Sequence, residues 1–216
     1  MKLLILGITG RTGRLVAEEA VKRGHKVIGI ARDSGRVPLK EVEIISGTPY
    51  DYNTVLKAIN GCDAVISTLS VFPRSKGLFG KIKTQFDLMS VSIKNTVKAM
   101  DETGIKRIVV MTAQGVGDSA KELPSIFAFL VKISNIKYSY IDHDLQEKVL
   151  ENSDLNWTIV RPVGLNNKNE NLSIVYNLNG EGKLKSMISR NAVAHFILNT
   201  IEKTQFIKQK PAISNS

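Results

Sequence analysis

Short apolar runs alternate along the chain with longer stretches in which apolar residues recur every three or four positions. The apolar runs cover residues 2–7, 26–32, 42–47, 62–70, 107–112 and 157–161, and they predict strands. The longer stretches predict helices over residues 11–23, 51–60, 84–103 and 142–152. Strands that alternate with helices in this way indicate an α/β fold, a doubly wound and mainly parallel sheet with helices on both faces.

The pattern changes in the C-terminal part of the chain. Residues 166–171 are polar, residues 172–178 alternate as an edge strand does, and residues 190–203 predict an amphipathic helix. The chain has 216 residues and contains no linker, repeat or low-complexity tract. We therefore expect a single domain over residues 1–216, in which residues 163–216 form a small elaboration on the substrate side.

Composition and charge are those of a globular protein with a basic surface. Hydrophobic residues make up 43% and charged residues 23% of the chain, and the formal net charge is +10. A basic surface attracts anions of any kind. Because no nucleic-acid-binding module is recognisable, we expect a small-molecule acceptor, anionic or aromatic, rather than nucleic acid as the partner.

The single cysteine, Cys62, excludes an internal disulfide. No apolar run approaches the roughly 20 residues of a membrane span, and the apolar N-terminus is too short for a signal peptide. We expect a cytoplasmic monomer or homodimer without a membrane partner. The sequence contains no spacing typical of metal ligands.

A glycine-rich turn follows the first predicted strand and opens the first predicted helix. Its sequence is Gly7-Ile8-Thr9-Gly10-Arg11-Thr12-Gly13. Glycines allow a sharp turn and a close backbone approach to a pyrophosphate, and the helix N-terminus then offers free N–H groups. The hydroxyls of Thr9 and Thr12 can add donors. This context predicts a dinucleotide-binding turn.

The G-x-x-G-x-x-G spacing of this turn resembles atypical members of the short-chain dehydrogenase/reductase superfamily. The nearest subgroup is similar to the biliverdin reductase B and flavin reductase proteins and to the NmrA-like NAD(P)-binding proteins. The resemblance covers nearly the whole chain, and its later landmarks are Arg32-Asp33-Ser34-Gly35-Arg36, Asp63-Ala64-Val65-Ile66, Met111-Thr112-Ala113-Gln114-Gly115, Asp142-His143 and Trp157-Thr158-Ile159-Val160-Arg161-Pro162. It implies a Rossmann-type fold that binds NAD(P).

Two arginines near the end of the second strand favour NADP(H) over NAD(H). In NAD-specific folds an acidic residue at this place binds the ribose 2′-hydroxyl, whereas this chain has Arg32, with Arg36 close behind. Two guanidinium groups can clamp a 2′-phosphate, and the resemblance implies this role. Asp33 keeps NAD(H) as an alternative. Thr48 stands where related proteins often carry an aspartate near the adenine.

Further cofactor contacts are implied by the resemblance and by the rule that ligands lie beyond the carboxyl ends of the strands. Leu69 and Ser70 match the segment that lines the ribose and adenine. Pro162 and Val163 match the segment near the nicotinamide. Thr112 and Ala113 follow the fifth strand.

The Tyr-x-x-x-Lys pair used by most short-chain dehydrogenases is missing, since none of the five tyrosines has a lysine four positions on. The catalytic candidates are therefore the Thr112 hydroxyl and His143, which could relay a proton near pH 7. Asp142 and His143 have an alternative interpretation, in which Asp142 is the N-cap of its own helix and His143 sits on the first turn.

These residues predict an NADPH-dependent reductase of a flavin-like, tetrapyrrole or quinone acceptor, acting by direct hydride transfer without a Tyr-x-x-x-Lys pair. The alternatives are a non-catalytic NADP(H) sensor, as among NmrA-like regulators, and an assembly factor that retains the cofactor for stability. Candidate apolar walls and basic rim residues of the acceptor pocket are Phe72, Pro73, Phe127, Phe129, Arg74, Lys76 and Lys81.

Overall fold

Parallel strands form the centre of the protein. The computed structural model describes residues 1–33, 35, 39–70, 85–168, 173–178, 180 and 183–216. Its main sheet has eight strands in the order β3-β2-β1-β4-β5-β6-β10-β8. The first six in sequence are parallel: β1 (Lys2–Leu6), β2 (Lys26–Ala31), β3 (Val42–Ser46), β4 (Ala64–Ser67), β5 (Arg107–Met111) and β6 (Asn156–Pro162). The predicted fold, a doubly wound and mainly parallel sheet, is confirmed.

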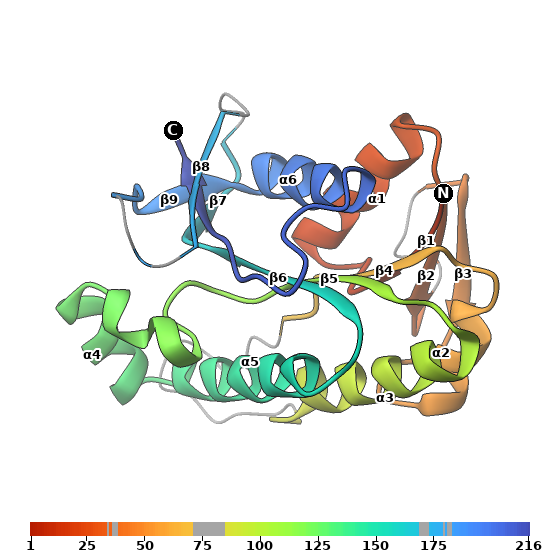
Figure 1. Cartoon of the computed structure of the whole chain (residues 1–216), viewed down its shortest axis with the longest axis horizontal. Coiled ribbons are helices and arrows are strands. Elements are labelled where there is room, and N and C mark those ends of the chain that lie inside the picture. Colours follow the sequence, from red (N-terminus) through yellow and green to blue (C-terminus); the bar gives the residue numbers. More distant parts are fainter. Residues whose placement is uncertain (34, 36–38, 71–84, 169–172, 179, 181–182) are drawn as a thin grey trace.

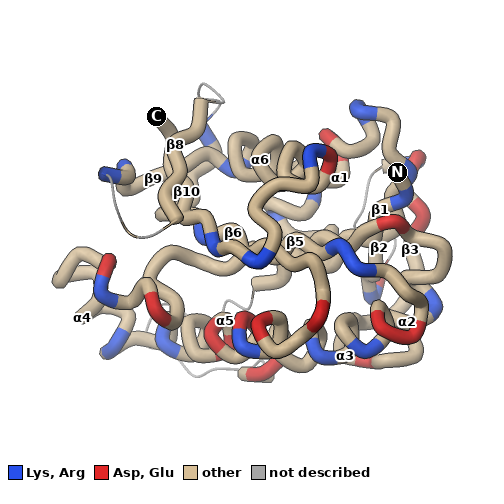
Figure 2. The backbone as a smooth tube through the Cα atoms, viewed as in Figure 1, with Lys and Arg blue, Asp and Glu red and all other residues tan. Residues whose placement is uncertain are grey.

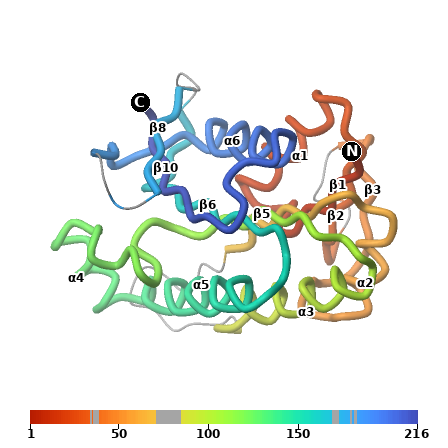
Figure 3. Tube along the Cα trace, viewed as in Figure 1, coloured from red at the N-terminus to blue at the C-terminus, as the bar shows by residue number. Residues whose placement is uncertain are grey.

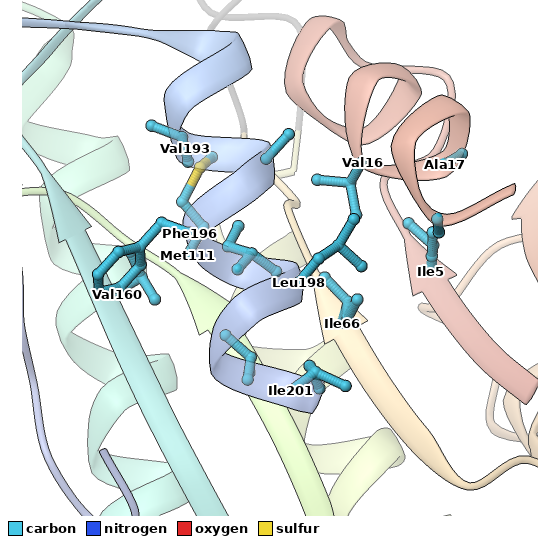
Figure 4. Close-up of a cluster of buried hydrophobic side chains, with 14 of the residues drawn as sticks. Ile5, Val16, Ala17, Ile66, Met111, Val160, Val193, Phe196, Leu198 and Ile201 are labelled. Carbon is cyan, nitrogen blue, oxygen red and sulfur yellow. The ribbon is translucent and has the colours of Figure 1, made fainter. Parts of the chain in front are cut away.

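Helices cover both faces of this sheet (Figure 1). One layer consists of α1 (Arg11–Lys22) and α6 (Arg190–Glu202), and the other of α2 (Tyr52–Ile59), α3 (Leu88–Thr103) and α5 (Ile136–Glu151). Each layer closes its own apolar core against the sheet. In the first core, side chains such as Val16 of α1 and Leu198 of α6 meet Ile5 and Ile66 of the sheet (Figure 4). Strands buried from both sides have continuous apolar sequences, which is the pattern that predicted them.

The C-terminal segment is built into the same sheet and core. Strand β10 (Ala212–Asn215) pairs in parallel with β6, and β8 (Ile174–Asn177) pairs with β10 in antiparallel fashion at the sheet edge. The predicted edge strand is thus confirmed over these four residues. A separate two-stranded sheet joins β7 (Gly164–Asn166) to β9 (Met187–Ser189). The chain ends beside β8, far from the N-terminus at the other side of the sheet (Figure 3).

The region before the sixth strand differs from the prediction. A short 3-10 helix, η2 (Gly117–Glu122), and helix α4 (Ser125–Ile133) come first. Helix α5 then begins at Ile136 and not at the predicted Asp142. The interpretation of Asp142 as the N-cap of its own helix is therefore wrong. Its carboxylate instead accepts hydrogen bonds from the backbone N–H groups of Met89 (2.8 Å) and Ser90 (3.0 Å) and caps α3, because the free N–H groups of a helix need acceptors wherever these come from.

Other caps follow the local sequence. Asp51 accepts hydrogen bonds from the N–H groups of Asn53 and Thr54 at the start of α2. Ser189 accepts from the N–H of Ala192 and makes Arg190 the first residue of α6. Among the described helices, none combines the length and apolarity that crossing a bilayer requires. Lys and Arg are spread over both helical layers (Figure 2).

Candidate functional site

A cleft of about 760 Å³ lies at the carboxyl ends of the parallel strands, where β1 separates β2 from β4. Open α/β sheets bind ligands at this place because the connections from adjacent strands leave on opposite faces. The lining comes mainly from the loops that follow β1, β2, β3 and β4, with additions from β5, β7, α6 and the start of α3. These residues are Gly7, Thr9, Gly10, Arg11, Thr12, Ile30, Ala31, Arg32, Gly47, Thr48, Pro49, Tyr50, Thr68, Leu69, Ser70, Gln85, Leu88, Met111, Leu165 and Arg190.

The glycine turn forms one end of the cleft, and its geometry excludes larger residues at Gly7 and Gly13. Gly7 has φ +83°, and its carbonyl accepts a hydrogen bond of 2.9 Å from the N–H of Gly10. A Cβ on Gly13 would lie 2.2 Å from that same carbonyl oxygen and 2.7 Å from the Thr68 hydroxyl. The glycines therefore let the start of α1 lie directly against the turn.

The N-terminus of α1 is open toward the cleft. Its N-cap, Gly10, makes no side-chain hydrogen bond, and no acidic residue lies in the first turn. The first N–H groups of the helix and the positive end of its dipole are thus available to an anion, and a diphosphate fits this arrangement. The residues present therefore suit the dinucleotide that the turn predicts.

The other end of the cleft contains two residues that were predicted to contact the adenosine half of the cofactor. Arg32 follows β2 directly, is exposed and lines the cleft with Thr48. Asp33 does not line it, because its carboxylate turns back and accepts a hydrogen bond of 3.0 Å from the N–H of Gly35. Arg36 lies outside the described residues. The described part of this end presents a cation where an NAD-specific site presents a carboxylate.

Most predicted cofactor contacts meet in the cleft, and some do not. Those that line it are Gly7, Thr9, Gly10, Arg11, Thr12, Arg32, Thr48, Leu69 and Ser70, while Gly13 lies immediately behind the turn. Thr112, Ala113, Pro162 and Val163 are not among its lining residues. The backbone near them extends the sheet: the N–H of Thr112 donates to Val160 and that of Val163 to Ile213.

The hydroxyl of Thr112 belongs to a buried charged network that the sequence did not reveal. It donates a hydrogen bond of 2.8 Å to Glu147 of α5, which pairs with Arg161 of β6 at 2.5 Å. Arg161 also pairs with Asp118 of η2. The side chains of Glu147 and Arg161 are only 2% and 4% exposed. This network connects the end of β5 with β6, α5 and η2. The Thr112 hydroxyl is one of its hydrogen-bond donors.

His143 lies on the buried side of α5, with 4% of its surface exposed. Its Nδ1 lies 2.6 Å from Nε2 of Gln146, and burial lowers its pKa to about 4. The ring is therefore neutral at pH 7 and lies apart from the cleft lining. The structure thus brings neither catalytic candidate, Thr112 nor His143, to the cleft.

The predicted acceptor walls are also elsewhere or not described. Phe127 and Phe129 lie on α4, where they are 38% and 63% exposed, and they do not line the cleft. Phe72, Pro73, Arg74, Lys76 and Lys81 lie outside the described residues. The lining residues that sequence reasoning missed include Tyr50, Met111, Leu165 and Arg190. No local sequence pattern marks Arg190 as a cleft residue, because it reaches the cleft only through the packing of α6 on α1.

Comparisons with known proteins agree with this geometry. A model of a family described as NAD(P)H-binding matches residues 7–204. The divinyl chlorophyllide a 8-vinyl-reductase of Arabidopsis thaliana is 25% identical over 232 aligned positions, which cover 97% of this chain and 52% of that protein. The chain thus spans about half the length of this relative, and shorter matches to plant reductases cover 26% of their length.

Solved structures share the fold. ChuY, an anaerobillin reductase from Escherichia coli O157:H7, superposes with a TM-score of 0.82 at 19% identity, covering all of this chain (100%) and 97% of that one. A short-chain dehydrogenase/reductase from Veillonella parvula DSM 2008, in complex with NADP, gives a TM-score of 0.78 at 17% identity and covers 99% of this chain and 94% of its own. At these identities the likeness establishes the fold.

Proposed function

Since the chain belongs to the NAD(P)H-binding family whose model matches residues 7–204, we propose that it is an NADPH-dependent reductase of conjugated acceptors. The resemblance to the atypical short-chain dehydrogenase/reductases is confirmed, and the chain is a member of that NAD(P)H-binding group. The proposal goes further on three points: the preference for NADP(H), the class of acceptor and the source of the proton.

The preference for NADP(H) rests on the charge at the adenosine end. Arg32 lines the cleft, whereas the carboxylate of Asp33 is held by the N–H of Gly35. A guanidinium beside the ribose favours a 2′-phosphate through charge-assisted hydrogen bonds, which are worth about 1.5–3 kcal/mol each. An NAD-specific site needs the opposite arrangement, with the carboxylate toward the ribose.

The class of acceptor rests on the absence of an acid or base in the described cleft lining. Of the ionisable groups there, three are arginines and the fourth is Tyr50, whose pKa is raised further from 10 by desolvation and by Asp87. Beyond the turn, Met111 and Leu165 add apolar surface. An acceptor whose conjugated ring spreads the added charge needs no protein acid at the moment of reduction.

The chemistry divides between cofactor, chain and solvent. Bound NADPH supplies a hydride, which carries two electrons and one proton to the acceptor. Water supplies the second proton, so that the acceptor gains two hydrogens and the cofactor leaves as NADP⁺. The chain would hold the diphosphate at the glycine turn and the adenosine at Arg32, and Met111 and Leu165 would offer apolar surface to the reacting groups. Flavins, linear tetrapyrroles and quinones meet these requirements.

The test combines a cofactor titration with an acceptor panel. NADPH and NADH are titrated against the wild type, Arg32→Ala and the control Lys26→Ala, which removes an exposed charge at the opposite end of β2. We expect Arg32→Ala to weaken NADPH binding by roughly tenfold or more and to change NADH binding little. Equal losses for both cofactors would contradict the NADP(H) preference.

The acceptor panel contains FMN, riboflavin, biliverdin and quinones, and turnover is followed at the NADPH absorbance band. Oxidation of NADPH that depends on one of these acceptors would support the reductase. Tight NADPH binding with no turnover on any of them would favour the alternative, a non-catalytic NADP(H) sensor, which the lack of an acid or base in the described cleft lining also suits.

A further inference from the structure

A second pocket, of about 400 Å³, adjoins the cleft on the side of the C-terminal segment. It shares Thr9, Gly10, Arg11 and Arg190 with the cleft. Its remaining walls come from the second turn of α1, the N-terminus of α6 and the residues that follow β7. It therefore starts at the diphosphate-binding turn and leads away from the adenosine end.

The lining of this second pocket is strongly basic. Arg11, Arg14, Lys168 and Arg190 contribute to it, and its described lining contains no acidic residue. Arg11 and Arg14 lie one turn apart on the same face of α1. The pairing of Asn166 in β7 with Ser189 in β9 brings Lys168 close to Arg190. Four cations from three separate segments thus meet at one small pocket.

Arg190 is the most constrained of the four. It is 8% exposed, and one of its Nη1–H groups donates a hydrogen bond of 2.6 Å to Oδ1 of Asn167. Within the described residues no carboxylate pairs with it. Burial, and then the charge of Arg11, lowers the pKa of Arg190. Burying an arginine beside another cation is unfavourable in the free protein, and an anion in the pocket would relieve it.

We propose that this second pocket binds a carboxylate or phosphate group carried by the acceptor, while NADP(H) occupies the adjoining cleft. The inference rests on the proposed reductase function and deepens it. Leu165 lines the cleft and Lys168, three residues later, lines the pocket. Arg190 lines both spaces, so an acceptor whose ring lies against Leu165 in the cleft would have its anionic side chain directed to Arg190 and Lys168.

The competing occupant of the pocket is the diphosphate of the cofactor itself, because Arg11 and Arg190 line both spaces. Arg14 distinguishes the two occupants, since it lines the second pocket and not the cleft. Arg14→Gln should weaken the binding of an anionic acceptor and leave NADP⁺ affinity unchanged. Lys22→Gln is the matched control, because it removes a charge from the exposed last turn of the same helix.

The experiment compares FMN with riboflavin, which share the ring and differ by one phosphate. NADP⁺ is titrated first, so that a failure of the cofactor to bind is seen before any flavin is added and counts against the proposed function alone. The binding of each flavin to the NADP⁺-saturated wild type, Arg14→Gln, Arg190→Gln and Lys22→Gln is then followed by flavin fluorescence.

We expect FMN to bind the wild type roughly tenfold or more tightly than riboflavin, since a charge-assisted hydrogen bond is worth that factor. The difference should shrink severalfold in Arg14→Gln and Arg190→Gln and persist in Lys22→Gln. Equal affinity for both flavins in the wild type, or an unchanged ratio in both pocket variants, would overturn the proposal.

If neither flavin binds, the binding of inorganic phosphate tests the pocket instead. Its binding to the NADP⁺-saturated protein is measured by calorimetry at low salt. Binding that weakens in Arg14→Gln and Arg190→Gln supports the pocket. No phosphate binding, or binding only in competition with NADP⁺, overturns the proposal and leaves the NADP(H) site in place.

Discussion

Replacing Glu147 with alanine should lower the free energy of unfolding by about 3–5 kcal/mol, because it removes the only buried carboxylate that pairs with the Arg161 guanidinium in the described part of the chain and leaves it a solvent-exposed one. Arg161 meets Glu147 through two atoms, with Nε 3.1 Å from Oε1 and Nη2 2.5 Å from Oε2. Both side chains are almost fully buried. The Thr112 hydroxyl would lose its acceptor at the same time.

The second carboxylate on Arg161 provides the matched control. Asp118 also lies 2.5 Å from Nη2, but its side chain is 67% exposed, so solvent screens most of its interaction. Asp118→Ala should therefore cost at most about 1 kcal/mol. The double variant Glu147→Leu, Arg161→Met should recover most of the loss, because apolar residues of similar volume can replace a buried ion pair.

The assay is urea unfolding followed by circular dichroism, with the free energy of unfolding obtained by linear extrapolation. The m-value, the slope of this free energy against urea concentration, reflects the surface that unfolding exposes. Unchanged m-values would show that the variants differ from the wild type in stability and not in that surface. If Glu147→Ala loses no more than Asp118→Ala, the network is not a structural element and the argument fails. Because the network lies off the cleft, the folded Glu147→Ala variant should bind NADPH as the wild type does.

Two further predictions concern the turn and the buried histidine. Gly13→Ala should weaken NADPH binding by at least roughly tenfold, because its Cβ would lie 2.2 Å from the Gly7 carbonyl oxygen. The control Gly24→Ala has space for its Cβ but a positive φ of +79°, so it should lower stability and leave the NADPH affinity of the folded protein unchanged. Equal losses of NADPH affinity in both variants would refute the role of Gly13. His143 has its pKa lowered from 6.5 to about 4, so the unfolded chain binds a proton that the folded chain does not, and this group should reduce stability progressively as the pH falls from about 6.5 toward 4. Across this range the wild type should lose unfolding free energy relative to His143→Gln as the pH falls, and a constant difference between the two proteins would contradict the assignment.

The parts of the fold that could be predicted are those that local sequence determines. Strands buried on both faces must be continuous in apolar residues, so β1, β2 and β5 were visible without a partner in view. The glycine turn was visible because its three glycines recur within seven positions directly after a predicted strand. Arg32 followed from its place at the end of β2.

The parts that could not be predicted depend on contacts between distant segments. Asp142 resembles a local N-cap, yet it caps a helix that begins more than fifty residues earlier, and sequence alone does not say which helix a carboxylate meets. Arg190 reaches the cleft through the packing of α6 on α1. Glu147 and Arg161 belong to different elements, and only the fold brings them together in the core.

The charges around the cleft explain why binding could be predicted from this sequence and the reaction could not. Every described charged side chain in the lining is an arginine: Arg11, Arg32 and Arg190. Arginine stays protonated in proteins, so it can hold phosphates but cannot exchange a proton during a reaction near neutral pH. The lining thus suits a polyanionic cofactor and leaves the choice of acceptor to shape and charge nearby. On the proposed function, we expect that choice to depend on residues 165–168 and on Arg190, because Leu165 and Arg190 line the cleft while Asn167, Lys168 and Arg190 line the basic pocket, and not on the sheet that supports them.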